Sequence, residues 1–399
     1  GIILFRTRTF ENVKKRCAKE FLITLEWKNM DIGILSMQQV DNFGSLLQAY
    51  SLKNILESYG NNVSFIDIKR NDEDFALLEN HSLDYSFEGE HSKGKSRICK
   101  VDKYVLNRLR NRQIEKRQNC IFEEFREKNL NIQEKKTRYD MCVIGSDEVF
   151  NCLNSGSWGF TSQLFGNVPE ADKVITYAAS CGATSYELLP EKIKDKIKKS
   201  FENISYCSVR DMNTFDFAKH FTNKMIAKNA DPVIVWEFKD NLDNVVIPKC
   251  PKRMCLIYSY RNRINDKSEI ENILTFCKEK NLTPVALGAP QYWINKYIAC
   301  DPFQCLKLFS VADFVITDTF HGTIFSLKYA KRFATIIRES NKHKLSDLLK
   351  TFGAEEHLLL NMGQIEDVYD INKESEIANK IAVERDNAIS YLEGAMETR

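Results

Sequence analysis

The sequence predicts an α/β protein made of two doubly wound parallel-sheet domains that face a cleft. At 399 residues the chain is long for one hydrophobic core and suits two domains. Short apolar, β-branched runs alternate with helix-like segments in both halves, which is typical of parallel strands joined by helices. Clusters of polar and small residues follow several of these runs, where such sheets bind their ligands.

A basic N-terminal extension, residues 1–29, precedes this pattern, and we expect it to be loosely ordered. The first unit is a strand at 32–35, a polar loop, a helix at 45–59 that Gly60 ends, and a strand at 63–68. A glycine at this point suits the left-handed conformation that ends many helices. The order strand, helix, strand indicates a parallel crossover connection.

The rest of the first half continues the alternation. One or two amphipathic helices are expected between residues 101 and 130, after an irregular polar stretch. Further strands are predicted at 139–144, 174–178, 206–209 and 233–236. We therefore expect residues 31–248 to form an N-terminal domain.

A second series of elements begins after the polar, proline-containing segment 240–251. Its elements are, in order, strand 254–260, helix 267–280, strand 283–287, helix 303–311, strand 314–317, a helix opening near His321, and strand 333–337. We expect residues 249–372 to form a C-terminal domain. The amphipathic segment 373–399 is predicted to be a helix that packs back on the first domain.

Composition limits the function. The formal net charge of +2 gives no indication of a nucleic-acid partner, and no apolar run is long enough for a spanning helix. Several of the scattered cysteines lie in apolar runs, which favours reduced, packed thiols and a cytoplasmic protein. Cys181 is interpreted in the same way, as a buried thiol rather than a nucleophile.

Two pairs of cysteines have a spacing that could be read as a zinc site: Cys250 with Cys255, and Cys300 with Cys305. Zinc-binding pairs usually lie closer together, in glycine-rich turns, whereas Cys255 begins a strand-like run. Packed, reduced cysteines are the favoured interpretation, and we expect neither a metal nor a cofactor.

Four clusters of hydrogen-bonding residues follow predicted strands. They comprise residues 41–45, 145–147 with Asn151, 208–211, and 318–322. The last places His321 after a buried strand and at the start of a helix, where free N–H groups favour an anion. A histidine there can hold an anion and transfer a proton near neutral pH.

Each cluster also has a purely structural interpretation. Asp41 and Asn42 suit a helix cap, residues 145–147 suit a turn, Arg210 could pair with Asp211, and His321 could be a satisfied core histidine. Four such clusters on two domains that share one cleft favour a functional site. The basic stretch 93–128 likewise has two interpretations, an amphipathic core helix or a surface for an anionic bilayer or lipid diphosphate.

Taken in order, these segments resemble the polysaccharide pyruvyl transferase family. The matching stretches are residues 32–50, 145–151, 177–182, 208–211, 231–232 and 313–322. The family usually has Gln and Trp where this chain has Glu148 and Phe150, so the resemblance leaves acceptor specificity open.

The resemblance implies two Rossmann-like domains arranged as in GT-B glycosyltransferases. It also implies transfer of the enolpyruvyl group of phosphoenolpyruvate, a donor substrate rather than a cofactor, onto two sugar hydroxyls, which gives a pyruvate ketal and phosphate. The acceptor would belong to a polysaccharide or to its polyprenyl-diphosphate-linked precursor. Such an acceptor suggests peripheral association with the cytoplasmic face of the inner membrane.

The resemblance also suggests roles for individual residues. Phosphoenolpyruvate would be bound by the cation and helix-start residues Arg210, His321, Gly322 and Arg338. His321 would be a phosphate ligand or general acid, and Asp147 a base or a ligand of the acceptor hydroxyl. The acceptor sugar would be bound by Asp41, Asn42, Ser146 and Asn151. Two alternatives remain open: a GT-B glycosyltransferase that uses a nucleotide sugar, and a non-catalytic carbohydrate-binding protein of polysaccharide assembly.

Overall fold

The computed structural model describes residues 29–79, 101–132, 135–152 and 159–397, so nearly all of the extension predicted at 1–29 lies outside it. Its first sheet has six parallel strands in the order β2-β1-β3-β4-β5-β6. These strands are β1 (Asp31–Leu35), β2 (Asn62–Phe65), β3 (Tyr139–Ile144), β4 (Ala171–Thr176), β5 (Ile204–Val209) and β6 (Ile226–Lys228).

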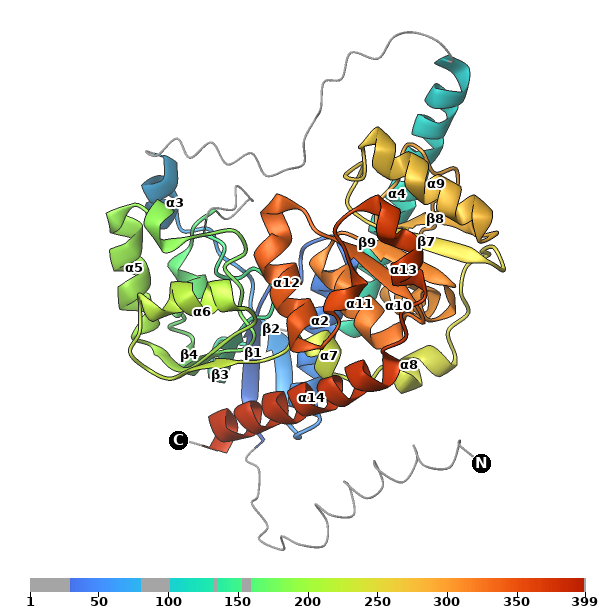
Figure 1. The fold of residues 1–399 in the computed structure, drawn as a ribbon. Helices are drawn as coiled ribbons and strands as arrows, with labels where there is room; N and C mark the ends of the chain where they lie inside the picture. Colours follow the sequence, from blue (N-terminus) through green and yellow to red (C-terminus); the bar gives the residue numbers. More distant parts are fainter. Residues whose placement is uncertain (1–28, 80–100, 133–134, 153–158, 398–399) are drawn as a thin grey trace, which may run out of the picture.

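The second sheet has five parallel strands in the order β11-β10-β9-β7-β8. They are β7 (Met254–Tyr258), β8 (Thr283–Leu287), β9 (Phe314–Thr317), β10 (Phe333–Ile336) and β11 (Leu358–Leu359). Helices connect the strands of both sheets, and the two sheets belong to separate lobes (Figure 1). The predicted class, two doubly wound Rossmann-like α/β domains, is confirmed.

The helices of the described residues cover both sheets and fill the space between the domains. They are α2 (Phe43–Glu57), α3 (Asp72–Glu79), α4 (Val101–Asn129), α5 (Glu191–Phe201), α6 (Met212–Lys219), α7 (Pro232–Val235), α8 (Lys239–Asp243), α9 (Lys267–Glu279), α10 (Pro302–Val311), α11 (Phe320–Tyr329), α12 (Lys342–Thr351), α13 (Ile365–Tyr369) and α14 (Glu374–Glu397).

The strand predicted at 233–236 is wrong, because this segment forms the short helix α7. Asp231 caps its N-terminus by accepting a hydrogen bond from the Val233 N–H at 3.0 Å, and Pro232 occupies the first turn. Proline suits that position because its ring fixes a helical φ and its missing N–H is not needed there. An apolar, β-branched run of four residues was too short to distinguish the two structures.

One apolar core continues from the first domain into the second. It joins side chains of α2 to those of the second sheet and α10. The ring of Phe43 lies 6.2 Å from that of Tyr258, and Tyr50 meets Phe303 edge-to-face at 5.1 Å. The domains are therefore packed against each other rather than only linked.

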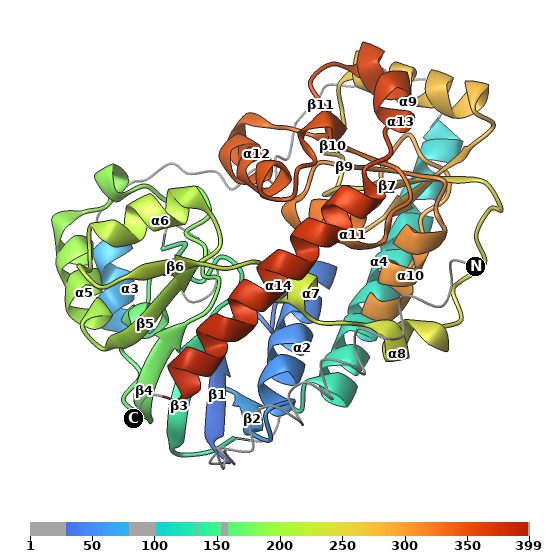
Figure 2. The same cartoon turned by 60° about the horizontal axis from the view of Figure 1, so that its bottom comes forward.

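Helix α14 returns from the C-terminal domain across the first sheet (Figure 2). The Tyr391 hydroxyl donates to the Thr176 carbonyl at 2.8 Å, and Lys173 Nζ donates to the Ala395 carbonyl at 2.6 Å. These bonds join helix α14 to strand β4.

Helix α4 accounts for the described part of the basic stretch at 93–128. Phe122 and Phe125 are buried in the core, and the Gln118 side chain bonds the backbone of Cys300 in the second domain. The C-terminal part of this basic stretch therefore packs in the hydrophobic core through its apolar side chains. In the part of the chain that the structure describes, no helix is both long and apolar enough to cross a membrane.

Candidate functional site

His321 reaches the space between the domains from the second residue of α11. Strand β9 ends at Thr317, and Thr319 caps the helix, its hydroxyl accepting from the Gly322 N–H at 3.0 Å. The imidazole packs directly on the backbone of Gly44, in the first turn of α2, where a Cβ would collide with the ring. A glycine at position 44 therefore lets a histidine of the second domain contact the first.

Arg210 approaches the same point from the first domain, just after β5. Its side chain is only 3% exposed, and its guanidinium lies 4.0 Å above the ring of Phe320. Nη1 is 3.0 Å from Asp231 Oδ2 and 3.9 Å from Asp147 Oδ1. Among the described residues, none accepts a hydrogen bond from its Nε. One donor of a buried cation thus has no partner among the described residues.

Asp231 is the shared counter-ion of the site. Its Oδ2 also accepts from the Ser146 hydroxyl at 3.2 Å and lies 3.5 Å from His321 Nε2. The histidine distance is at the limit of a hydrogen bond, and no other described residue satisfies Nε2. Burial raises the pKa of Asp231, but hydrogen bonding to His321 and the charges of His321 and Arg210 outweigh it and lower the pKa to about 2.

Asp147 stands at the open side of this cluster. Its backbone has φ +76°, which is unfavourable for a residue other than glycine, and its Oδ2 accepts from the Ser45 hydroxyl at 2.7 Å. The side chain is 14% exposed, so its carboxylate is more accessible than that of Asp231. Of Asp147 and Asp231, Asp147 is therefore the residue whose carboxylate a ligand can reach.

Glu148 joins the two domains beside Asp147. Its Oε1 lies 2.6 Å from Nζ of Lys344 on α12, and its Oε2 accepts from Asn151 Nδ2 at 2.9 Å. Burial raises the pKa of Glu148, but the charge and hydrogen bond of Lys344, then Asn151 and Arg210, lower it to about 2.

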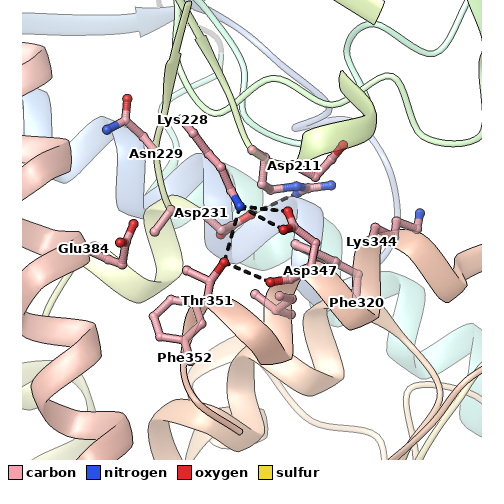
Figure 3. A pocket seen from close by; sticks show the side chains of 13 residues that line it. Asp211, Lys228, Asn229, Asp231, Phe320, Lys344, Asp347, Thr351, Phe352 and Glu384 are labelled. Carbon is pink, nitrogen blue, oxygen red and sulfur yellow. Dashed lines mark hydrogen bonds and ion pairs between the residues drawn. The ribbon is translucent and has the colours of Figure 1, made fainter. Parts of the chain in front are cut away.

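A shallow pocket lies beside Arg210, with about 350 Å³ of empty space that includes open solvent. It separates the loops after β5 and β6 from one face of α12. Figure 3 shows Lys228 of the first domain bonded to Asp347 and Thr351 of α12. The walls are strongly charged: Arg210, Lys228 and Lys344 alternate with Asp211, Asp231, Asp347 and Glu384.

Comparison with known proteins gives the family. The family model described as polysaccharide pyruvyl transferase matches residues 42–340. The chain belongs to the polysaccharide pyruvyl transferase family. The match covers parts of both domains and includes Asp147, Arg210, Asp231 and His321, whereas Lys344 lies outside it.

We found no match to this sequence among curated proteins. Among solved structures, UDP-GlcNAc 2-epimerase from Methanocaldococcus jannaschii is similar at 14% identity and a TM-score of 0.43, over 89% of this chain and 99% of that one. UDP-N-acetylglucosamine 2-epimerase from Rickettsia bellii is similar at 12% identity and a TM-score of 0.46, over 92% and 96%. At these scores the likenesses support no argument about the chemistry of this family member.

The structure brings some of the predicted site residues of this pyruvyl transferase family member together. Arg210, His321 and Ser146 lie against Asp231, Asp147 lies 3.9 Å from Arg210, and Gly322 contributes its N–H to the cap of α11. Asn151 lies beyond them, where its amide bonds Glu148 and its carbonyl accepts from Thr184. It supports Glu148 rather than facing the open side.

Three other predicted ligands have structural partners. Asp41 pairs with Arg126 of α4, and the Asn42 side chain accepts from the Ser45 N–H at 2.7 Å as the cap of α2. Arg338 forms two bonds with Glu269, at 2.7 and 3.0 Å, and a weaker contact with Asp318. These three side chains take part in caps and ion pairs, and substrate binding by them stays a prediction.

Asp231 and Lys344 were missed as site residues. The pair Asp231-Pro232 carried a signal, since aspartate before proline is a typical helix start, and its place in the resemblance was noted. Nothing near Lys344 in the sequence distinguishes it from its neighbours Lys342 and Lys350. Only the docking of α12 against the first domain brings it to the pocket.

Lys328 holds the other end of the contact between α11 and α7. It lies seven residues after His321, on the same side of α11, and its Nζ donates to the carbonyls of Val233, at 2.8 Å, and Trp236. Burial lowers the pKa of Lys328 to about 7, against the opposing charge of Glu237. The helix that carries His321 is thus fixed to the helix that Asp231 caps.

This lysine should make stability depend on pH. Its pKa is about 7 in the folded protein and 10.5 ordinarily, so the unfolded chain binds more protons between these values. The free energy of unfolding should therefore rise with pH across that window, by up to about 1.4 kcal/mol per pH unit relative to Lys328→Met. Urea denaturation at pH 7 and pH 9 measures this, with the exposed Lys331→Met as control. A pH-independent difference between wild type and Lys328→Met would contradict it.

Proposed function

We propose that this family member transfers the enolpyruvyl group of phosphoenolpyruvate to two hydroxyls of a sugar, forming a pyruvate ketal and releasing phosphate. One observation supports the proposal above all. An imidazole from the second domain and a guanidinium from the first share Asp231, 3.5 and 3.0 Å away, and Asp147 lies 3.9 Å from the same guanidinium. An acid, a base and an anion anchor therefore lie within one small volume.

The donor needs cations, because it carries both a phosphate and a carboxylate. Arg210 carries a planar guanidinium that can offer a two-point contact, which lysine cannot imitate, and its buried Nε has no partner among the described residues. Lys344 lines the pocket beside Arg210 and can add a second positive charge. The first turn of α11, which carries His321, adds backbone N–H groups that favour an anion.

The chemistry then assigns a proton step to each group. His321 gives a proton to C3 of the enol while the first sugar hydroxyl attacks C2 and loses its proton to Asp147. The C2–O bond to phosphate breaks, and phosphate leaves with the bonding electrons. The second hydroxyl attacks C2 and loses its proton to His321, which closes the ring, and the proton held by Asp147 goes to the departing phosphate. One phosphoenolpyruvate and one diol thus give one ketal and one phosphate.

The acceptor in this proposal is a sugar of a polysaccharide or of its polyprenyl-diphosphate-linked precursor. A lipid-linked acceptor would be met at the cytoplasmic face of the inner membrane, by peripheral association. The proposal includes no nucleic-acid partner, metal or cofactor. The residues that would contact the sugar are those at the open side of Asp147.

Thermal denaturation tests the donor without knowledge of the acceptor. Phosphoenolpyruvate is expected to raise the melting temperature, since a ligand that binds only the folded state stabilises it. Stabilisation by UDP or GDP sugars instead would favour a glycosyltransferase. A phosphate-release screen against lipid-linked acceptors, with mass spectrometry for the ketal, tests the reaction. Donor binding without turnover on any acceptor would favour a non-catalytic carbohydrate-binding protein.

Arg210→Lys is expected to weaken phosphoenolpyruvate binding at least about tenfold, because one ammonium cannot reproduce the two-point contact. The dissociation constant is measured by calorimetry. Arg253→Lys, at a half-exposed arginine far from the cluster, is the matched control and should bind like wild type. An unchanged dissociation constant in Arg210→Lys would exclude Arg210 as the donor clamp.

A further inference from the structure

Glu148 forms an ion pair with Lys344, and the ammonium of Lys344 is a cation that the donor would need for binding. Lys344 Nζ is 2.6 Å from Glu148 Oε1, and the two side chains are 18% and 27% exposed. Lys344 also lines the pocket with Arg210 and Phe320. A negatively charged side chain of the protein therefore holds this ammonium beside the anion site.

The first domain holds Glu148 rigidly. Its second oxygen accepts from Asn151, and the Asn151 carbonyl accepts from Thr184 at 3.0 Å. The carboxylate also packs against Gly182, where a Cβ would lie 2.6 Å from Oε2. Side-chain movement at this pair is accordingly left to the lysine, whose four-carbon chain is flexible.

The charges around the pair reinforce it. Burial lowers the pKa of Lys344, but the charge and hydrogen bond of Glu148 outweigh it, and the pKa is raised overall. Arg210 acts in the opposite direction on Lys344 because the two cations repel each other. The lysine is thus charged and near Arg210, yet already neutralised by Glu148.

We propose that Glu148 is a built-in competitor for the donor, which holds Lys344 until a phosphate or carboxylate group of phosphoenolpyruvate takes its place. This regulation rests on the proposed function. It predicts that Glu148 lowers donor affinity and that its effect acts mainly through Lys344, its direct partner. A carboxylate that acted only through its general field would instead change donor affinity whether or not the lysine were present.

Calorimetry with phosphoenolpyruvate as the probe tests this with four proteins: wild type, Glu148→Gln, Lys344→Met and the double variant. Glu148→Gln keeps the shape of the side chain and removes its charge, so donor binding should tighten about tenfold. Lys344→Met should weaken binding to a similar degree. In the Lys344→Met background, Glu148→Gln should change affinity less than about twofold, since additivity fails for residues in direct contact. The exposed Glu202→Gln and Lys350→Met are the matched controls and should bind like wild type.

Three results would overturn the competitor. They are unchanged or weaker binding in Glu148→Gln, equal tightening with and without Lys344, and unchanged binding in Lys344→Met. If Glu148→Gln does not fold, Glu148→Asp, which draws the carboxylate back from the lysine, should also tighten binding, and a failure to do so overturns the proposal. Folded wild type that does not bind phosphoenolpyruvate removes the proposed function together with the competitor. Binding by wild type with any of the three results above removes the competitor alone.

Discussion

His321→Ala is expected to lower the rate of ketal formation by about 100- to 10,000-fold, the usual contribution of a general acid. The loss should appear in kcat, because the proton is transferred during the reaction. The fold should survive, since the imidazole packs on Gly44 and near the rings of Phe320 and Phe325, and its polar contact among the described residues is the 3.5 Å approach to Asp231. Mass spectrometry of the ketal and release of phosphate measure the rate, and circular dichroism checks the fold.

The control for this variant is His343→Ala, which removes an exposed histidine from α12 and should keep wild-type activity. A folded His321→Ala protein with near-normal kcat would exclude the histidine from proton transfer. A protein with normal kcat but weaker donor binding would instead make His321 a phosphate ligand. These two outcomes separate the two roles proposed for it.

Asp231→Ala is expected to lower the free energy of unfolding by about 3–5 kcal/mol, the cost of breaking a buried ion pair. The change leaves Arg210 buried beside an empty space, and it also removes the cap of α7 and the acceptor for Ser146. Urea denaturation measures the loss. Asp240→Ala, at an exposed position of α8, should cost less than about 0.5 kcal/mol. A loss as small as that of the control would show that the pair does not stabilise the fold.

The stabilising effect of Asp231 should also depend on pH. Its pKa is about 2 in the folded protein against an ordinary value of 3.8, so the unfolded chain takes up the proton first as the pH falls. The contribution is complete above about pH 4 and is lost as the pH falls through 2. The difference in unfolding free energy between wild type and Asp231→Asn should shrink across this window. A constant difference would mean that the carboxylate is not held in its charged form.

Much of the fold was predictable from periodicity. Strands such as 139–144 and 314–317 are short, apolar and bounded by polar loops, and both are strands in the structure. The exception is 233–236, where the capping signal of Asp231-Pro232 decides for a helix. Local apolar pattern failed there because a buried helix of four residues and a buried strand share it.

The site was predictable in part, for a physical reason. His321, Arg210 and Asp147 each follow a strand, so the carboxyl edges of the parallel sheets bring them to one cleft. Asp41 follows a strand too, but Arg126 neutralises it, and this partner comes from a helix 85 residues away. Lys344 lies on a helix face and enters only when α12 docks. Contacts such as these depend on tertiary packing, so the local sequence did not predict them.

The apolar core that joins α2 to the second sheet and α10 restricts how substrates can enter. Tyr50 and Phe303, like Phe43 and Tyr258, would be wetted if the lobes swung widely apart, at a cost of about 25 cal/mol for each Å² of apolar surface exposed. A wide hinge motion that separates the two domains is therefore disfavoured. Entry of the donor and acceptor should therefore depend on rotamer changes of side chains at the surface of the site, while the two domains keep their relative orientation.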